Sequence, residues 1–262
     1  MPHKLTGATR IHLIVGDPIA QTKSPEGLTR VFAERGVDAV CVPMQVAVAD
    51  IDAFMMVAKR ARNVDGIVAT VPHKFAALRH CDALSERARM LGAVNAMRRE
   101  PDGSWSGDMT DGVALVAALH AAGFEPRARR ALVVGAGGAG SAVVLALADA
   151  GAEVAVHDID VARREALRAR LASRTIAVGS ADPAGFDLVA NATPLGMAAG
   201  DPLPVAVDRL GAGAIAADLV TKPAVTPFLD AARRRGAPII TGVDMFEAQA
   251  GILADFLLAA AG

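Results

Sequence analysis

The fold is decided by the stretch Ala131-Leu132-Val133-Val134-Gly135-Ala136-Gly137-Gly138-Ala139-Gly140-Ser141. Four apolar residues run into a cluster of glycines, and an alanine- and leucine-rich helical pattern follows through Ala150. This order predicts a buried strand, a tight turn and a helix. Gly135, Gly137 and Gly140 fill the three glycine positions of a G-x-G-x-x-G fingerprint. Such a turn binds the pyrophosphate of a dinucleotide at the start of its helix.

The residues that follow the fingerprint strengthen this prediction. A second strand is predicted at Glu153–His157, and Asp158 stands at its end, eighteen residues past Gly140. An acidic residue at that place can bind the ribose hydroxyls of the adenosine. In the alternative interpretation the turn is a plain strand–helix connection, and Asp158 caps the next helix together with Asp160.

Length and composition narrow the class of protein. The 262 residues are enough for one large domain or two modest ones, and 53% of them are apolar. A net charge of −1 without a basic tract argues against nucleic-acid binding. The first ten residues lack the apolar core of a signal peptide, and no apolar run reaches membrane-spanning length. We therefore expect a cytoplasmic protein with neither a nucleic-acid nor a membrane partner.

The cysteines give no sign of a metal site. Cys41 and Cys81 are far apart and lack metal-type spacing. We expect two reduced, mostly structural thiols and no bound metal.

Predicted strands and helices alternate along the chain, which is typical of a layered α/β fold with parallel sheets. The predicted strands lie at residues 11–15, 39–44, 66–71, 131–134, 153–157, 175–178, 187–191, 214–218 and 238–241. The predicted helices span residues 25–35, 48–62, 111–122, 161–171 and 244–261, with others after Pro72 and after the fingerprint. The part after the fingerprint predicts a doubly wound sheet. The polar segment 98–107, with a hairpin signal at Asp102-Gly103, is the preferred domain boundary.

Two ionisable residues stand where α/β proteins form their sites. Lys74, one of only five lysines, comes just after the strand at 66–71, where a partly desolvated ammonium can exchange protons. Asp111 stands at the entrance to the helix at 111–122. From position alone, a solvated surface lysine and a first-turn acid that meets the helix dipole explain both residues better.

Several further segments resemble those of the shikimate dehydrogenase family, in the family's order and over nearly the whole chain. They are Gly16-Asp17-Pro18 with Thr22-Lys23-Ser24-Pro25, Thr70-Val71-Pro72-His73-Lys74, Gly92-Ala93-Val94-Asn95, Gly107 to Gly112, the glycine loop, Asn191 to Met197, and Gly242 to Gln249. The resemblance implies a two-domain α/β protein with an active-site cleft between the domains. Residues 1–106 plus 243–262 would form a substrate-binding domain, and residues 107–242 a Rossmann domain.

The resemblance also implies roles for single residues. Lys74 and Asp111 become a catalytic pair: neutral lysine takes the proton of a secondary alcohol, and the carboxylate holds the lysine in line and stabilises its ammonium form. The implied substrate contacts are Thr22, Ser24, Thr70, Asn95 and Gln249. The implied cofactor contacts are Gly135, Gly137, Gly138, Ala139, Gly140, Asp158, Asn191, Thr193, Leu219, Gly242 and Met245.

Plainer roles compete at several of these positions. Thr22 and Ser24 can cap their own loop, and Thr70 can cap the turn that follows it. Gln249 can be an exposed residue of the terminal helix.

Four positions depart from the family's usual pattern. Thr22 stands in place of serine, Val68 and Met109 in place of asparagine, and Thr221 in place of tyrosine. The missing amides and phenol change the polar contacts available to ring substituents. We expect shikimate or a closely related cyclic hydroxy acid as the substrate, with quinate or an aminated shikimate analogue as alternatives.

The resemblance also bears on the choice of cofactor. Family members that prefer NADP commonly carry Asn-Arg-Thr after the second strand of the cofactor domain, whereas this chain has His157-Asp158-Ile159. A carboxylate repels a 2′-phosphate and can accept a hydrogen bond from a free 2′-hydroxyl. We therefore expect NAD rather than NADP.

Two other functions compete with a dehydrogenase of this kind. A folate-type methylene dehydrogenase also pairs a lysine with a Rossmann domain. Residues 16–25 resemble the family's loop for the substrate carboxylate, here called the carboxylate loop, and its hydroxyls Thr22 and Ser24, together with Asp111, argue against a folate-type enzyme. A non-catalytic sensor could bind NAD and a ring acid, although it has no need of both Lys74 and Asp111. In each case we expect a monomer or a homodimer.

Overall fold

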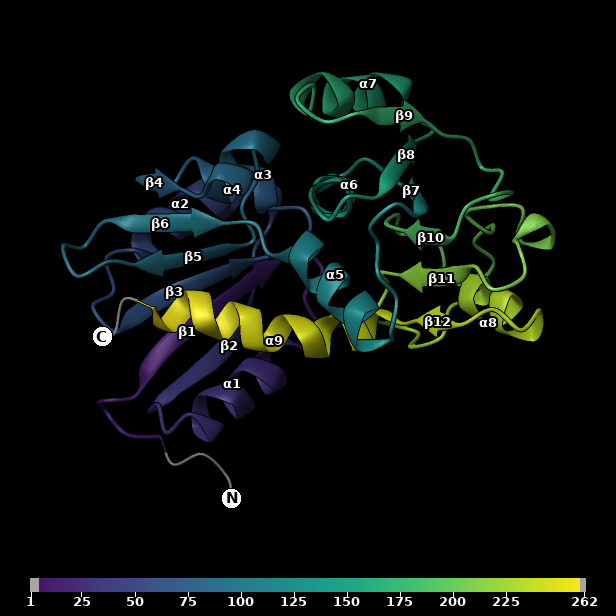
Figure 1. Cartoon of the computed structure of the whole chain (residues 1–262). Coiled ribbons are helices and arrows are strands. Elements are labelled where there is room, and N and C mark those ends of the chain that lie inside the picture. Colours follow the sequence, from purple (N-terminus) through teal and green to yellow (C-terminus); the bar gives the residue numbers. More distant parts are fainter. Residues whose placement is uncertain (1–4, 260–262) are drawn as a thin grey trace. The chain divides into compact units, whose positions relative to one another are not determined.

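The computed structural model describes residues 5–259, and the chain forms two compact units (Figure 1). Unit 1 consists of Met1–Thr110 and Ala250–Gly262, and unit 2 of Asp111–Gln249. The first division falls four residues later than the expected one, because the last strand of unit 1 runs through Asp108 and pairs with its neighbour in the first sheet. The described part of the chain holds no helix long and apolar enough to cross a membrane.

Unit 1 contains a mixed six-stranded sheet in the order β2-β1-β3-β5-β6-β4. Its strands are β1 Arg10–Gly16, β2 Ala39–Gln45, β3 Val64–Ala69, β4 Ala83–Leu84, β5 Ala96–Arg99 and β6 Trp105–Asp108. The first three strands pair in parallel, as the strand–helix alternation predicts. β5 pairs antiparallel with β3, and it also pairs antiparallel with β6, because the hairpin at Asp102-Gly103 reverses the chain between β5 and β6.

The first helix of unit 1 lies one residue earlier than the expected helix at 25–35, and the helix at residues 86–91 was not expected. Unit 1 contains the helices α1 Ser24–Glu34, α2 Ile51–Ala58 after a 3-10 turn at Val48–Asp50, α3 Lys74–Leu78 and α4 Glu86–Leu91. The helix expected at 48–62 is shorter, because a turn after α2 leads into β3. α3 begins at Lys74 itself, two residues after Pro72.

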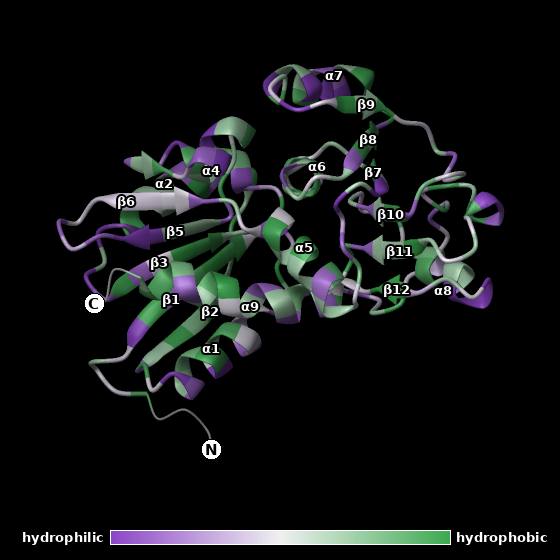
Figure 2. Cartoon of the chain, in the orientation of Figure 1, coloured by the Kyte–Doolittle hydropathy of each residue, from purple (hydrophilic) through white to green (hydrophobic). Residues whose placement is uncertain are grey.

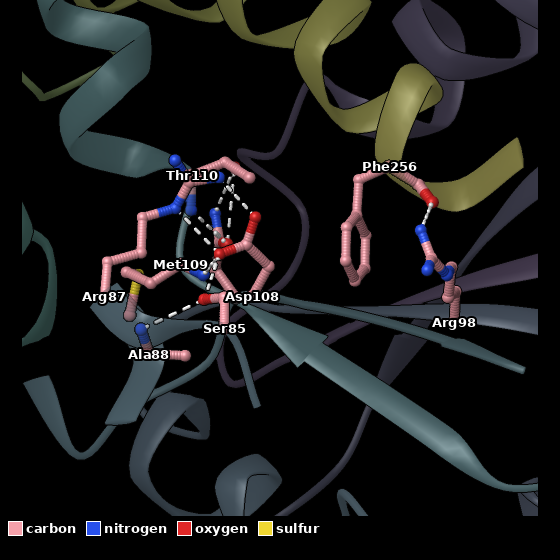
Figure 3. A network of polar contacts seen from close by, with 9 residues as sticks. Ser85, Arg87, Ala88, Arg98, Asp108, Met109, Thr110 and Phe256 are labelled. Carbon is pink, nitrogen blue, oxygen red and sulfur yellow. Dashed lines mark hydrogen bonds and ion pairs between the residues drawn. The ribbon is translucent and has the colours of Figure 1, made fainter. Parts of the chain in front are cut away.

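The last helix, α9 Gly242–Leu258, completes the core of unit 1. Ile14 of β1 and Val68 of β3 pack with Phe32 of α1 and with Leu253 and Leu257 of α9. Arg98 of β5 donates a hydrogen bond to the backbone carbonyl of Phe256 and stacks over its ring, as Figure 3 shows. Residues 260 and 261, the end of the helix expected at 244–261, lie outside the described residues.

One polar side chain lies within this apolar core. His12 of β1 is 1% exposed, stacks against the ring of Phe32, and its Nδ1 has no hydrogen-bond partner. A Cβ on Gly66 of β3 would collide with this imidazole and come within 2.6 Å of Leu257, so only glycine fits beside it. Burial lowers the pKa of His12 from 6.5 to about 4.

We expect His12 to make the fold sensitive to acid. The pKa of His12 in the folded protein, about 4, lies below its ordinary value of 6.5. The contribution of His12 to the free energy of unfolding is therefore fully present above pH 6.5 and is lost as the pH drops towards 4. The loss amounts to roughly 3 kcal/mol in the free energy of unfolding. Urea unfolding of the wild type and of His12→Leu from pH 4 to pH 8 measures it.

The His12→Leu variant isolates this contribution from other groups. Burial raises the pKa of Asp218 to about 6, so its contribution to stability changes in the opposite direction between pH 4 and pH 6. Because both proteins contain Asp218, the difference between them reports His12 alone. Equal pH dependence in wild type and variant would show that His12 does not titrate in this way.

Unit 2 is built on a parallel six-stranded sheet in the order β12-β11-β10-β7-β8-β9. The strands are β7 Arg130–Val134, β8 Glu153–His157, β9 Ile176–Val178, β10 Leu188–Asn191, β11 Ile215–Asp218 and β12 Ile239–Ile240. The direction of strand succession reverses between β7 and β10, so the predicted doubly wound sheet is confirmed. In such sheets ligands bind at the carboxyl ends of the strands beside this reversal.

Helices accompany the strands of this sheet. They are α5 Asp111–Ala121, α6 Gly138–Asp149, α7 Val161–Arg170 and α8 Pro227–Arg234, with a 3-10 turn at Val207–Arg209. In Figure 2 strands β10 to β12 are coloured hydrophobic along most of their length, as expected for strands covered on both faces. α7 is largely hydrophilic there, and Leu167 is its one buried residue.

Candidate functional site

The glycine fingerprint forms a turn that is open to a ligand. Gly135 has a φ of +107°, and a Cβ on it would lie 2.8 Å from the carbonyl oxygen of Ala192. A Cβ on Gly140 would collide with the carbonyl oxygen of Gly135, so helix and turn pack without a gap. A Cβ on Gly137, by contrast, would meet nothing within 4 Å, and α6 begins directly after it. This open backbone at a helix start fits a dinucleotide pyrophosphate.

Asp158 binds the fingerprint turn itself. One carboxylate oxygen accepts a hydrogen bond from the Ala136 N–H at 2.7 Å, and the other from the Asp160 N–H at 2.8 Å. The guanidinium of Arg163 lies 3.8 Å away. Asp160, not Asp158, caps α7 by accepting from the Arg163 N–H. Asp158 therefore joins the end of β8 to the turn between β7 and α6.

The other predicted cofactor residues gather at the ends of β10 and β11. The buried Asn191 accepts hydrogen bonds from the N–H and the hydroxyl of Thr193, and its carbonyl oxygen accepts from the Leu219 N–H at 3.0 Å. A Cβ on Gly242 would collide with the Val220 carbonyl oxygen, so the start of α9 packs against the loop after β11. Met245 is buried in the first turns of α9.

Two buried residues of this cluster were not predicted from the sequence. Asp218 at the end of β11 accepts a hydrogen bond from the hydroxyl of Thr226, which caps α8. The available signal was an acidic residue that directly follows three apolar strand residues and precedes a Thr-Pro helix start.

Lys74 lies in a segment that its neighbours hold in place. The His73 imidazole nitrogen Nε2 contacts the Val46 carbonyl oxygen at 2.7 Å, and a carbonyl can only accept, so Nε2 carries the proton. The Lys74 carbonyl oxygen accepts from the Val94 N–H at 2.9 Å. The Lys74 side chain is buried, with 8% exposure of the residue. The interpretation as a solvated surface lysine therefore does not apply.

Asp111 is the first residue of α5 and is 6% exposed. Its Oδ1 accepts a hydrogen bond from Nε2 of Gln249 at 2.8 Å. A Cβ on Gly112 would collide with the carbonyl oxygen of Ala142, so α5 packs directly on α6, the helix of the fingerprint. Gln249 is half-buried and orients this carboxylate, so it is not a freely exposed residue of α9.

The residues just before Asp111 form a polar network, which Figure 3 shows. The Asp108 carboxylate accepts hydrogen bonds from the Ser85 hydroxyl at 2.5 Å, from the guanidinium of Arg87 and from the Met109 N–H. Burial alone would raise the pKa of Asp108, but the bonds from Arg87 and Ser85 outweigh it and hold the pKa below its ordinary value. The N-terminus of α4 is thereby fixed to the end of β6.

Asn95 continues this network. Its Oδ1 accepts from the Thr110 N–H at 2.8 Å, and its Nδ2 donates to the Thr110 hydroxyl at 3.0 Å. Asn95 and Thr110 are both buried. The amide that was expected to bind a ring hydroxyl thus also fixes the residue before Asp111.

The hydroxyls of the carboxylate loop differ in their surroundings. The Thr22 hydroxyl donates to the Ile19 carbonyl oxygen at 3.0 Å, as the loop-capping interpretation describes. Ser24 is buried in the first turn of α1. Gly16, where β1 ends, leaves room for the Thr70 methyl group, since a Cβ there would collide with it. The carboxylate loop and the Lys74 segment therefore pack against each other within unit 1.

Two of the four positions that depart from the family pattern hold buried apolar side chains. Val68 belongs to the core of unit 1, and Met109 is 1% exposed.

Cys41 and Cys81 are free thiols, and burial raises the pKa of each to about 12. Among the residues from 5 to 259, no group of three or more His, Cys, Asp or Glu side chains could hold a metal ion.

The fold and these residues define a class: an α/β protein with a Rossmann-type dinucleotide-binding unit and a second, mixed-sheet unit. Comparison with known proteins agrees. The family model for the shikimate dehydrogenase substrate binding domain matches residues 14–97. Shikimate dehydrogenase (NADP(+)) from Acidiphilium cryptum is 39% identical over 249 residues, which cover 94% of this chain and 89% of that protein. The chain therefore belongs to the shikimate dehydrogenase family.

Solved structures of shikimate and quinate dehydrogenases have a similar fold. Shikimate 5-dehydrogenase from Thermus thermophilus, in a complex with NADP(H) and shikimate, has a TM-score of 0.87 and 29% identity. The match covers 96% of this chain and 94% of that one. Quinate dehydrogenase from Corynebacterium glutamicum in complex with NAD has a TM-score of 0.84 and 26% identity, with the same coverage of 96% and 94%.

Proposed function

We propose that the protein is a nicotinamide-dependent dehydrogenase that reversibly oxidises a ring hydroxyl of shikimate or a closely related cyclic hydroxy acid. The observation that carries the proposal is the burial and fixed setting of Lys74 and Asp111 in a member of this family. A binding protein has no need of a buried lysine and a buried, oriented carboxylate, whereas alcohol oxidation needs a group that takes the hydroxyl proton.

Lys74 and Asp111 act as the acid–base pair in this proposal. A bound nicotinamide would supply the acceptor for the hydride that leaves the carbon carrying the hydroxyl. Neutral Lys74 takes the hydroxyl proton at Nζ, and in the reverse direction its ammonium returns the proton. The Asp111 carboxylate, oriented by Gln249, stabilises the ammonium form.

Substrate binding is assigned to unit 1. Ser24, Thr70 and Asn95 supply hydroxyl and amide groups, and Thr22 does so if its hydroxyl turns away from Ile19. We also propose Gln249 as a substrate contact. Because Val68 and Met109 offer no amide, the polar contacts to ring substituents differ from the family pattern, so quinate and an aminated shikimate analogue are the further candidates.

A comparison of ring acids tests this proposal. Initial rates of cofactor reduction with shikimate, quinate and an aminated shikimate analogue give a kcat/KM for each compound. We expect measurable turnover of at least one of them. Turnover of a methylene-folate substrate instead would assign the protein to the competing class of dehydrogenase.

We propose NAD as the preferred cofactor, although the Acidiphilium relative is named for NADP. The argument is the carboxylate of Asp158, which lies beside the fingerprint turn and repels a 2′-phosphate. The guanidinium of Arg163 lies 3.8 Å from Asp158 and 3.4 Å from Asp160, and these two carboxylates offset its charge.

The ratio of kcat/KM for NAD to that for NADP tests the cofactor assignment. We expect the wild type to favour NAD, and Asp158→Asn to shift the ratio towards NADP by about tenfold, because the charge is lost. An equal loss with both cofactors would mean that Asp158 only holds the turn. A wild type that favours NADP by about tenfold would refute the assignment.

A further inference from the structure

A buried carboxylate joins the loops at the ligand-binding edge of unit 2. Asp218, at the end of β11, is 1% exposed. Its Oδ1 accepts hydrogen bonds from the Val220 N–H at 3.0 Å and from the Asn191 side chain at 3.1 Å. Its Oδ2 accepts from the Thr226 hydroxyl at 2.7 Å. The three donors belong to the loop after β11, the end of β10 and the start of α8.

Each partner of Asp218 fixes a further piece of backbone. Asn191 holds the hydroxyl of Thr193 at 2.6 Å and donates to the Leu195 carbonyl oxygen at 3.0 Å. The Val220 loop packs against Gly242, where α9 begins. We name the segments 191–196 and 218–220 the edge loops.

The edge loops adjoin the glycine fingerprint. β10 lies next to β7, and the Ala192 N–H donates to the Val134 carbonyl oxygen at 2.7 Å. The Ala192 carbonyl lies against Gly135, the first glycine of the turn. The loops that Asp218 shapes therefore stand at the strand ends where this fold binds its ligands.

A buried carboxylate destabilises the folded protein at this position, which argues against a purely structural role for Asp218. Burial outweighs the three hydrogen bonds and raises the pKa of Asp218 from 3.8 to about 6. Its partners from β10, the loop after β11 and α8 are an amide, a backbone N–H and a hydroxyl, and none of these titrates. No cation offsets the burial among these partners, so the charge costs stability.

We propose that Asp218 is a positioning residue for the cofactor: its carboxylate holds the edge loops in the conformation that binds the dinucleotide. Asp218 does not touch the cofactor in this proposal. The inference rests on the proposed function only in requiring that unit 2 binds a nicotinamide dinucleotide, and it needs no particular substrate.

Protonation should loosen this arrangement. Oδ2 is the oxygen that gains the proton at least cost, because the Thr226 hydroxyl can then turn from donor to acceptor. The hydroxyl would then be shared between this proton and the Leu229 N–H that it already accepts. We therefore expect cofactor affinity to fall as the pH drops through about 6.

The test is direct binding of NADH and NADPH, followed by nicotinamide fluorescence between pH 5.5 and pH 8. The variant Asp218→Asn has the shape of the protonated acid at every pH. We expect it to bind about tenfold more weakly than the wild type near pH 7.5 and to lose the pH dependence. At pH 5.5 the wild type should approach the affinity of the variant.

Two further variants separate positioning from folding. Asp187→Asn changes an acid at the opposite end of β10, where Asp187 accepts from the Arg130 N–H, and should leave the affinity unchanged. Thr226→Val removes one donor to the charged carboxylate, so the midpoint of the binding profile should move to higher pH. If Asp218→Asn does not fold, Thr226→Val serves as the test of the proposal in its place.

Some outcomes would overturn the proposal. Asp218→Asn binding NADH within about twofold of the wild type would do so. A weaker affinity with an unchanged pH profile would equally reduce Asp218 to a structural residue. A wild type that binds neither NADH nor NADPH would instead refute the proposed function.

Discussion

The variant Lys74→Ala is expected to lower kcat by about 10²–10⁴-fold, the usual range for a lost acid–base group. Lys74 is buried in a segment held by the contact of His73 with Val46 and by the backbone bond from Val94. Alanine leaves these anchors in place, because neither involves the lysine side chain. The loss should therefore fall on turnover, with little change in cofactor affinity.

A matched control accompanies this variant. Lys222 is an exposed lysine of unit 2 without a role in the proposed chemistry, and Lys222→Ala should keep wild-type kcat. Thermal melting of both variants shows whether the fold is retained. Near-normal turnover of a folded Lys74→Ala protein would remove the lysine from the mechanism.

The variant Asp111→Ala should lose kcat over the same range of about 10²–10⁴-fold. The carboxylate is buried at the start of α5 and oriented by Gln249, and the proposed mechanism uses its charge to stabilise the ammonium form of Lys74. Initial rates at saturating substrate, compared with those of the wild type at the same pH, measure this loss.

Asp111→Asn separates charge from position. The asparagine oxygen can still accept the hydrogen bond from Gln249, so the loop geometry is kept while the charge is lost. A kcat close to that of Asp111→Ala would identify the charge as the active property. If Asp111→Asn works like the wild type, the residue only fills space or caps α5, and its place in the acid–base pair falls.

The sequence pattern predicted the cofactor-binding unit well, because its signals are local. The apolar run at 131–134, the three glycines and the strand at 153–157 each follow from a few adjacent residues, and the structure reproduces them. The parallel pairing of the six strands also follows from the alternation of strands and helices, because each crossover connection brings the chain back in the same direction.

The second half of the first sheet was less predictable. β4 has two residues and α4 six, so neither is long enough to show a period. Their placement depends on distant partners, above all the bonds of Ser85 and Arg87 to Asp108. Such contacts cannot be read from the spacing of residues.

The same limit applies to the candidate site. Residue type and the family resemblance identified candidate site residues such as Lys74. They did not predict which contacts each side chain makes. Asn95 holds Thr110, which the sequence did not predict, and Thr22 binds its own loop, which the sequence offered only as one of two interpretations. Asp218 was not predicted because its hydrogen bonds to Asn191, 27 residues away, and to Thr226 arise only when the strands and α8 come together in the fold.

We propose above that this member of the shikimate dehydrogenase family oxidises a ring hydroxy acid. The most direct test follows absorbance at 340 nm when the purified protein is mixed with NAD or NADP and shikimate, quinate or an aminated shikimate analogue. We predict cofactor reduction that depends on the ring acid and is abolished in Lys74→Ala. A folded wild type that binds the cofactor but reduces it with none of the three acids would contradict the proposed function.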